Sequence, residues 1–317
     1  MEYRNLGRSG LQVSAVGLGC NNIGRQVDQA GTIEIVNKCV EMGITYFDTA
    51  DVYGAERGKS EEFLGKALKP HRRNVVLATK GSGRMGEGPY WSGNSRRYLM
   101  DALDASLRRL DTDYVDLYEL HFPDPLTPIE ETLRALEDMV RSGKVRYVGC
   151  CNFSLAQVCE AALASEIAHT IAFVSAQNRY NLLEREIRDE LLPACERLGM
   201  GMLPYYPLAS GLLTGKYRRG EPTPEGTRLT SGIHFYAGVL ESADYDLLDR
   251  LTDYAAERGH SLLELAIGWL ASQPAVGSVM TGATRVEQIE QNAKAGDWRL
   301  SAAEMKEVDA LLAGGVA

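Results

Sequence analysis

The chain has 317 residues, 44% of them hydrophobic and 24% charged, and these fractions exclude a largely disordered protein. Its 43 acidic and 34 basic side chains leave a formal net charge of −9, which argues against nucleic acid as a partner. No stretch approaches the roughly 18 consecutive apolar residues of a membrane span, and the first residues lack the apolar core of a signal peptide, so we expect a soluble, cytoplasmic protein.

Short β-branched runs alternate with stretches of helical periodicity through most of the chain. The predicted strands, each followed by its helix, are residues 16–18 and 32–42, 44–47 and 60–68, 75–78 and 95–110, 114–120 and 128–142, 145–151 and 154–165, 172–176 and 186–198, 202–205 and 261–271, and 278–280 and 286–293. Ser154 and Ser301 stand where N-caps are expected, and glycines follow several helical stretches, as C-caps often do. Strands that alternate with helices predict a parallel sheet, because parallel neighbours need a crossover.

The number of these units decides between two architectures that the length allows. A chain of this length could form two domains, but single α/β barrels also reach about 250 residues or more. Eight units favour one closed (β/α)8 TIM barrel, so we predict an α/β fold with a single domain over residues 1–317. Residues 3–13 predict an N-terminal β-hairpin before the barrel, and residues 244–258 and 302–312 predict extra helices.

Neither the cysteines nor the glycine-rich motifs indicate a metal or a classical nucleotide site. The six cysteines form no Cys-x-x-Cys pair, so we expect them to be reduced and mostly buried, with no metal bound. Residues 81–86 match the dinucleotide fingerprint, but the glycines and proline that follow prevent the required helix, and we predict a loop up to Ser95. Residues 211–217 resemble a phosphate-binding loop with too few residues between its glycines and with Tyr217 in place of Ser or Thr.

Four ionisable side chains stand at or just after the carboxyl ends of three successive predicted strands. They are Asp48, Tyr53, Lys80 and His121. In a barrel these strand ends form the mouth, where functional residues collect. Each side chain alone also has a structural explanation: a turn cap, rim packing, a solvated lysine and a core histidine, respectively. Their grouping on neighbouring strands favours an active site.

These residue types together can protonate a developing alkoxide without a metal. The unperturbed pKa of tyrosine, about 10, is too high for easy proton donation at neutral pH. An adjacent ammonium favours the phenolate and lowers that pKa, and a carboxylate paired with the ammonium holds it in place. A histidine can donate to the substrate oxygen and orient it. The set is a general-acid site that still requires a source of hydride.

The sequence around these residues resembles the aldo-keto reductase superfamily. The segments that carry the resemblance are FDTADVYG at residues 47–54, ATK at 78–80 and LH at 120–121. Further matching segments lie at residues 6–14, 106–110, 143–149 and 177–183. The segment PLASGLLTGKY at residues 207–217 is typical of the bacterial members related to potassium-channel β-subunits. The resemblance extends nearly from end to end.

The resemblance implies a (β/α)8 barrel that binds NADP(H) without a Rossmann domain. It makes Tyr53 the proton donor, with Lys80 and Asp48 as the residues that tune it. It makes His121 the group that orients the carbonyl. The implied cofactor-binding residues are Asn152 and Gln177 at the nicotinamide amide, Tyr205 on its ring, Leu208, Gly211, Leu213, Lys216 and Arg228 over the pyrophosphate, and Gly282, Thr284, Arg285, Gln288 and Asn292 at the adenosine end.

Arg285 predicts which cofactor is preferred. A guanidinium at a helix N-terminus suits a ribose 2′-phosphate, which needs positive charge and bidentate donors. We therefore expect a preference for NADPH over NADH, the alternative being an ordinary surface arginine. Three positions depart from the family pattern near the implied cofactor site: Cys151 and Tyr206 stand where serine is usual, and Thr281 stands where proline is frequent.

The implied substrate pocket rests on three residues. Asn21 stands where many members have a large aromatic residue or methionine, which predicts a more polar pocket. Tyr90 and Trp91, in the loop after Lys80, either line this pocket or pack within their own loop.

The sequence thus predicts reduction of a small-molecule aldehyde or ketone by NADPH, or the reverse oxidation of an alcohol. Two alternatives stay open. One is an auxiliary subunit that binds NADP(H) as a redox sensor and turns over slowly, as the channel-related members allow. The other is a barrel hydrolase or lyase that uses no nicotinamide.

Overall fold

Parallel strands form the centre of the molecule in the residues that the computed structural model describes, which are 1–224, 229 and 238–314. Hydrogen bonds join the two ends of this sheet, from the N–H of Met280 to the carbonyl of Pro204 (3.1 Å) and from the N–H of Gly277 to the carbonyl of Met202 (2.8 Å). The sheet therefore closes into the predicted barrel. Its strands, in spatial order, are β10 (Val279–Thr281), β3 (Val16–Gly19), β4 (Tyr46–Asp48), β5 (Val76–Gly81), β6 (Val115–Leu120), β7 (Val145–Cys151), β8 (Ser175–Gln177) and β9 (Gly201–Met202).

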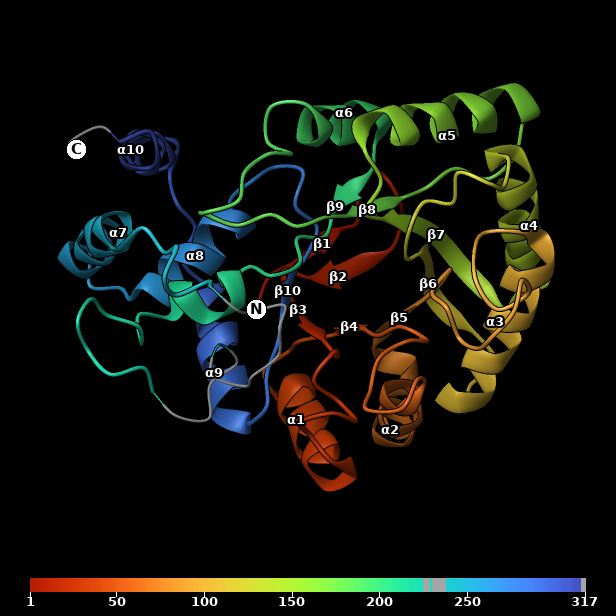
Figure 1. Cartoon of the computed structure of the whole chain (residues 1–317), viewed down its shortest axis with the longest axis horizontal. Coiled ribbons are helices and arrows are strands. Elements are labelled where there is room, and N and C mark those ends of the chain that lie inside the picture. Colours follow the sequence, from red (N-terminus) through yellow and green to blue (C-terminus); the bar gives the residue numbers. More distant parts are fainter. Residues whose placement is uncertain (225–228, 230–237, 315–317) are drawn as a thin grey trace.

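Helices surround these strands as an outer ring (Figure 1). The ring consists of α1 (Gln29–Glu41), α2 (Lys59–Leu68), α3 (Arg96–Leu110), α4 (Ile129–Arg141), α5 (Leu155–Ala168), α6 (Leu191–Leu198), α8 (Leu262–Ala271) and α9 (Val286–Ala295). Outside the ring, α7 (Tyr245–Glu257) packs on α8, and α10 (Ala302–Leu312) packs on α7. Short 3-10 turns occupy Arg72–Asn74 and Ala209–Thr214. The α/β barrel class and the extra helices expected from the sequence are confirmed.

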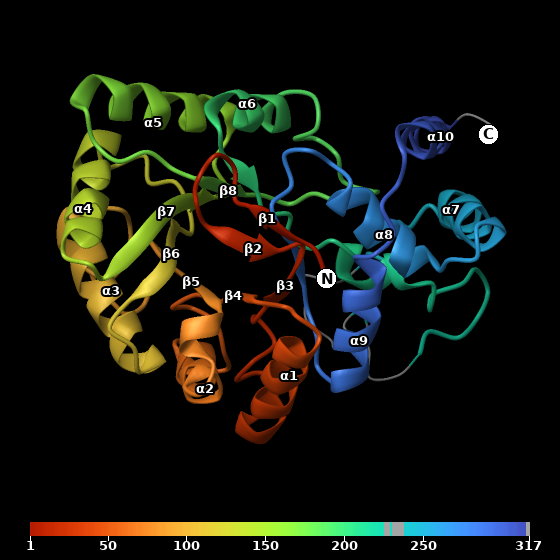
Figure 2. The ribbon, with the colours of Figure 1, turned by 180° about the vertical axis from the view of Figure 1, so that it is seen from behind.

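An antiparallel hairpin crosses the barrel at the end where the strands begin (Figure 2). Its buried side chains Leu6, Leu11 and Val13 pack with residues that point into the barrel, among them Tyr46 and Leu117. The carbonyl of Gly199, just before β9, accepts from Arg8 N–H at 2.8 Å. The hairpin therefore seals the amino-terminal end of the barrel with apolar side chains. Its two strands are β1 (Tyr3–Asn5) and β2 (Gln12–Ser14).

Local capping residues fix several helix ends where the sequence predicts them. The hydroxyl of Ser154 accepts from the N–H of Gln157 (3.3 Å), and the side chain of Gln157 accepts from the N–H of Ser154 (3.0 Å). Ser301 forms the same capping box with Glu304 at the start of α10. Each box satisfies backbone donors that a helix start leaves unpaired. Helix α6 ends at Leu198, and the residue that follows, Gly199, adopts a φ of 74°, which glycine accommodates without strain.

The prediction of a helix over residues 186–198 is wrong at its beginning, because α6 starts only at Leu191. Pro193 explains the difference. A proline inside a helix lacks the N–H for the i−4 bond and clashes with the preceding turn. In the observed helix Pro193 is the third residue, where no intrahelical partner for its N–H is needed.

Removal of the Leu6 side chain tests the seal at the hairpin end. Leu6 is 0% exposed, so Leu6→Ala is expected to lower the free energy of unfolding by about 2–5 kcal/mol. Leu126 is 90% exposed and provides the matched control, whose alanine variant should change that free energy by less than about 0.5 kcal/mol. Urea denaturation measures both, and equal losses would contradict the packing role of Leu6.

Candidate active site

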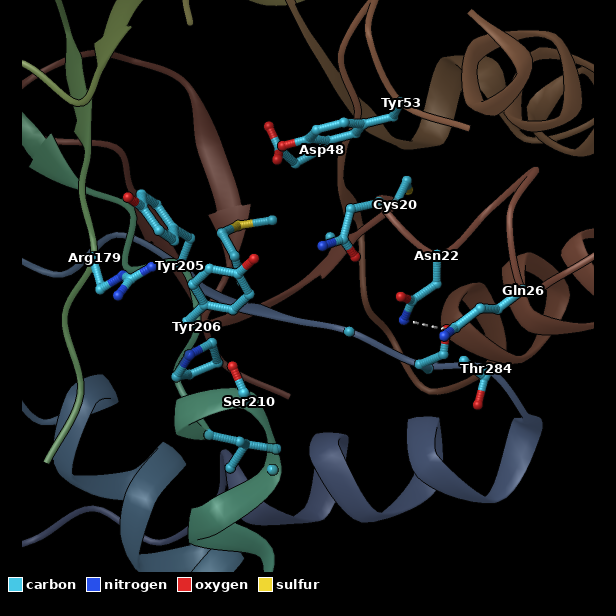
Figure 3. Close-up of a pocket in the computed structure, with 18 of the residues that line it drawn as sticks. Cys20, Asn22, Gln26, Asp48, Tyr53, Arg179, Tyr205, Tyr206, Ser210 and Thr284 are labelled. Atoms are coloured by element: carbon cyan, nitrogen blue, oxygen red, sulfur yellow. Dashed lines mark hydrogen bonds between the residues drawn. The ribbon is translucent and has the colours of Figure 1, made fainter. Parts of the chain in front are cut away.

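A cavity of about 1160 Å³ opens at the carboxyl ends of the strands (Figure 3). It extends from Asp48 and Tyr53, at the centre of the barrel, to Arg285 and Gln288 at the beginning of α9. Parallel strands bring their carboxyl ends to one mouth, so residues far apart in the sequence meet there.

A buried ion pair lies at the inner end of this cavity. Lys80 Nζ is 2.6 Å from each carboxylate oxygen of Asp48 and donates to the carbonyl of Thr49 at 3.0 Å. The side chains are 0% and 5% exposed for Lys80 and Asp48, respectively. Both stand at inward-facing positions of neighbouring strands, since Asp48 is in register with Ala78, two residues before Lys80. Loss of either partner would leave an uncompensated buried charge, at a cost of about 3–5 kcal/mol.

Tyr53 and His121 complete the cluster that the sequence predicts. Lys80 Nζ lies 5.4 Å from the centroid of the Tyr53 ring, and the rings of Tyr53 and His121 meet edge-on with centroids 5.6 Å apart. Phe122 stacks on His121 with centroids 4.4 Å apart and also lines the cavity. The structure therefore brings the four strand-end residues into one group.

Burial dominates the electrostatics of this group. It raises the pKa of Tyr53; the Lys80 ammonium lowers that pKa, but not enough to offset burial. The expected sign of the lysine effect is therefore right, while the expected net lowering is wrong for this structure. Burial also lowers the pKa of His121 to about 3, and the charge of Lys80 acts in the same direction. The imidazole is neutral at neutral pH and carries one N–H donor.

Asn152 and Tyr205 line the same cavity and are hydrogen-bonded to each other. The hydroxyl of Tyr205 donates to Asn152 Oδ1 at 2.7 Å, and Asn152 Nδ2 donates to the carbonyl of His121 at 3.0 Å. Asn152 and Tyr206 have left-handed φ values of 62° and 54°. Such backbone strain in non-glycine residues persists where the surrounding contacts enforce it, and it collects at functional sites.

The implied cofactor residues divide into those that line the cavity and those that do not. Leu213 is fully buried outside the lining, and buried Asn292 donates from Nδ2 to the carbonyl of Gly282 at 3.4 Å. Arg228 lies outside the residues that the structure describes. The residues that line the cavity are Asn152, Gln177, Tyr205, Leu208, Gly211, Lys216, Gly282, Thr284, Arg285 and Gln288.

Of the three implied substrate-pocket residues, Asn21 alone lines this cavity. Tyr90 is 59% exposed, with the guanidinium carbon of Arg97 only 3.9 Å from its ring centroid. Trp91 lies over Gly86 in the same loop. Trp91 therefore packs within its own loop, whereas Tyr90 packs against the first turn of α3.

Sequence reasoning missed several residues of the site. Glu119 is buried inside the barrel and contacts Gln177, as described below. The alternation of β6 could have found it, because Glu119 stands two residues before His121 and therefore faces the same side. No comparable pattern marks the other missed residues, which come from loops. These include Cys20, Asn22, Gln26, Phe122, Arg179 and Ser210.

Comparison with known proteins assigns this chain to a family. The aldo/keto reductase family matches residues 15–313. The chain belongs to this family, and it is an oxidoreductase that acts on carbonyl and alcohol groups.

Its relatives have been given different functional names. A protein of Escherichia coli O157:H7 named L-glyceraldehyde 3-phosphate reductase is 37% identical over 99% of this chain and 93% of its own length. A rice protein named probable voltage-gated potassium channel subunit beta is 38% identical over 94% of this chain and 92% of its own. Aldo-keto reductase YhdN of Bacillus subtilis is 34% identical over 98% and 94%.

Within residues 1–224, 229 and 238–314, no helix combines the length and the apolar character that a bilayer span needs. In the same part of the chain, no three His, Cys, Asp or Glu side chains are grouped as metal ligands would be. All six cysteines are free, and Cys159 is the exposed one.

Asp51, two residues before Tyr53, carries a second buried carboxyl group. It is 0% exposed, and neither carboxylate oxygen has a hydrogen-bond partner among the described residues. Burial, followed by the charge of Glu61, raises its pKa to about 8. Because the pKa is higher in the folded than in the unfolded chain, this group stabilises the fold at low pH. That contribution is lost as the pH rises from about 4 through about 8.

Asp51→Asn is expected to make the protein more stable than the wild type, by a margin that grows between about pH 5 and about pH 8. The limiting slope is about 1.4 kcal/mol per pH unit, since asparagine does not titrate. Thermal unfolding at several pH values measures the margin, with exposed Asp113→Asn as the control. A margin that is independent of pH would show that Asp51 is ionised in the folded protein.

Proposed function

We propose that this protein reduces an aldehyde or ketone to the alcohol with NADPH, or catalyses the reverse oxidation, and that Tyr53 exchanges the proton with the substrate oxygen. The observation that carries this proposal is the buried Lys80–Asp48 pair beside Tyr53, at the inner end of the cavity. The cavity volume of about 1160 Å³ exceeds the usual range of about 300–1,000 Å³ for small-ligand pockets, which leaves room for a dinucleotide and a substrate.

The residues that line the cavity fit NADP(H). At the inner end, the amides of Asn152 and Gln177 and the ring of Tyr205 suit a nicotinamide carboxamide and its ring. At the outer end, α9 begins without a side-chain cap, so its first backbone N–H groups are available to an anion. The side chain of Arg285, 71% exposed at this helix start, adds the charge that a 2′-phosphate requires. When bound, NADPH supplies the hydride.

The hydroxyl of Tyr53 is protonated at neutral pH, and because burial raises its pKa, donation depends on groups that stabilise the phenolate. As the proton leaves toward the substrate oxygen, the Lys80 ammonium stabilises the phenolate that forms. Asp48 holds the ammonium in place through two short hydrogen bonds. The neutral imidazole of His121 donates to the substrate oxygen and aims it at Tyr53. In the reverse direction, the phenolate takes the proton back.

A second candidate function is a redox-sensing auxiliary subunit that binds NADP(H) and turns over slowly. The relative named as a potassium channel subunit supports it. The presence of all four proton-handling residues in one group favours the enzyme. Cofactor oxidation over many turnovers per site, with a panel of aldehydes and ketones, supports the enzyme, and a halt after one turnover supports the sensor.

The fold and the cysteines also bear on the domain organisation and the cellular location. We propose that residues 1–317 form one domain, because the hairpin packs inside the barrel and α7 and α10 pack against it in series. Free cysteines are typical of reducing compartments, which supports a cytoplasmic location. The expected partner is a small-molecule carbonyl or alcohol substrate.

Tyr53→Phe tests the assigned proton donor. The variant removes the hydroxyl alone, so kcat is expected to fall roughly 10²–10⁴-fold, while the Kd for NADPH stays nearly unchanged. Stopped-flow turnover and fluorescence titration measure the two quantities. Tyr90→Phe, outside the cavity, is the matched control and should keep wild-type kcat. Retention of turnover in Tyr53→Phe would exclude the mechanism.

Arg285→Ala tests the preference for NADPH. Loss of the guanidinium should weaken NADPH binding by roughly tenfold or more, and it should leave NADH binding nearly unchanged because NADH lacks the 2′-phosphate. Arg141→Ala, which removes an arginine 72% exposed on α4, controls for the change in net charge. Equal weakening of both cofactors would contradict the assignment.

A further inference from the structure

Glu119 is a buried carboxyl group beside the active-site ion pair, and the mechanism above does not use it. Its side chain is 0% exposed, and it points into the barrel from β6. Across the sheet, Glu119 is in register with Lys80 on β5 and with Gly149 on β7. It therefore lies in the same layer of the barrel interior as the ion pair.

Two hydrogen bonds tie Glu119 to β8, the next strand but one in the barrel. Ser175 Oγ donates to Glu119 Oε1 at 2.9 Å, and Gln177 Nε2 donates to Glu119 Oε2 at 3.0 Å. The same Gln177 nitrogen lies 3.3 Å from Asp48 Oδ1, so two carboxyl groups share one amide donor. Gly149 makes the contact possible, because a Cβ there would lie 2.1 Å from Ser175 Oγ and 3.0 Å from Glu119 Oε1.

The charges around Glu119 are unbalanced. Asp48 takes both short hydrogen bonds of the Lys80 ammonium, so ionisation of Glu119 adds an uncompensated negative charge. Burial raises the pKa of Glu119 to about 8; Lys80 and the Ser175 bond lower it and Asp48 raises it. The titratable, charged or hydrogen-bonding groups that act on it or on its immediate neighbours are Tyr46 and Asp48 from β4, Lys80 from β5, Cys150 and Cys151 from β7, and Ser175 and Gln177 from β8.

Of these neighbours, Tyr46, Cys150 and Cys151 stay neutral, because burial raises each pKa well above its ordinary value. Asp51 titrates in the same range as Glu119, but Glu61 and Arg109 act on its charge more strongly than Lys80 does. Burial also raises the pKa of Asp48, the other carboxyl in contact with Gln177, but its two short hydrogen bonds to the Lys80 ammonium hold it ionised. Glu119 is therefore the carboxyl in contact with Gln177 whose charge changes in mildly alkaline solution.

We propose that Glu119 is a positioning residue that acts through Gln177, and that its ionisation selects the oxidised cofactor over the reduced one. This inference rests on the proposed function, in which Gln177 holds the nicotinamide amide. When Glu119 is protonated, the opposite charges of Asp48 and Lys80 cancel each other. Ionised Glu119 places a negative charge directly behind Gln177, which favours the positively charged ring of NADP⁺ over the neutral ring of NADPH.

The charge of Glu119 and the charge of the bound cofactor affect each other equally, so the effect can be measured from either side. If ionised Glu119 favours NADP⁺, then NADP⁺ lowers the pKa of Glu119 and its binding releases a proton from that carboxyl to solvent. NADPH has no ring charge and releases none at this residue. The phosphates are common to both forms, so their own titration cancels in the ratio of the two dissociation constants.

The experiment compares the ratio Kd(NADPH)/Kd(NADP⁺) at about pH 6.5 and about pH 9.5, by titration calorimetry. For the wild type the ratio should rise roughly tenfold, the equivalent of one pKa unit. In Glu119→Gln, which keeps the shape and replaces one acceptor oxygen with an NH2 donor, much as protonation adds an O–H donor, the ratio should be flat. Glu160→Gln removes an exposed carboxylate on α5 and should behave as the wild type.

Ser175→Ala gives an independent second variant. It removes a donor that lowers the pKa of Glu119, so the rise of the ratio should move to higher pH. This variant decides the question even if Glu119→Gln does not fold. A readout without cofactor follows from the same titration: wild-type stability should fall more steeply between about pH 5 and about pH 8 than that of Glu119→Gln.

The outcomes separate this inference from the function on which it rests. An equal rise of the ratio in the wild type and Glu119→Gln, or an unshifted rise in Ser175→Ala, overturns the role of Glu119 while NADPH-dependent turnover stands. A flat ratio in the wild type also overturns it. Failure of the wild type to bind either nucleotide overturns both the inference and the proposed function.

Discussion

The ammonium of Lys80 is the charge around which the interior of the barrel is arranged. Enclosed by apolar strands, it would cost several kcal/mol to desolvate without a partner, and the two 2.6 Å bonds to Asp48 offset that cost. The attraction between Lys80 and Asp48 offsets the desolvation cost only while the two groups stay in hydrogen-bond contact, so the surrounding structure must be rigid. The parallel strands supply that rigidity, since β4 and β5 hold both side chains in fixed register. The hairpin helps to exclude water from the opposite end.

This arrangement separates two tasks within one cavity. Strand residues near the ion pair handle the proton, and their positions are set by backbone hydrogen bonds that continue through the barrel. Loop residues farther out, such as Tyr206 and Ser210, hold left-handed backbone conformations that shape the rim. The barrel therefore fixes the residues that handle the proton, and the loops shape the outer walls of the cavity. Loops on a rigid scaffold are the usual place for the contacts that select a substrate.

The fold and the proton-handling group were predictable because each depends on local patterns. Alternating strand and helix periods indicate the barrel, and Asp48, Lys80 and His121 stand at strand ends that topology brings together. The net pKa of Tyr53 was not predictable, because it depends on how deeply the surrounding chain buries the site. The positions of Tyr90 and Trp91 depend on the path of a glycine-rich loop that no periodicity fixes. The start of α6 depended on reading Pro193 as a first-turn residue rather than an interior one.

The missing side chain of Gly149 has a consequence for how this sequence can change. Glu119 and Ser175 stand on strands that are not neighbours, and their contact crosses the space that a Cβ at residue 149 would fill. A single methyl group there would separate them, so no one-step substitution at this position is compatible with the contact. Substitutions at residues 119, 149 and 175 therefore depend on one another. The closer of the two clashes is with Ser175 Oγ, so a larger residue at 149 requires a change at Ser175 first, and loss of the acid at 119 alone does not make room for it.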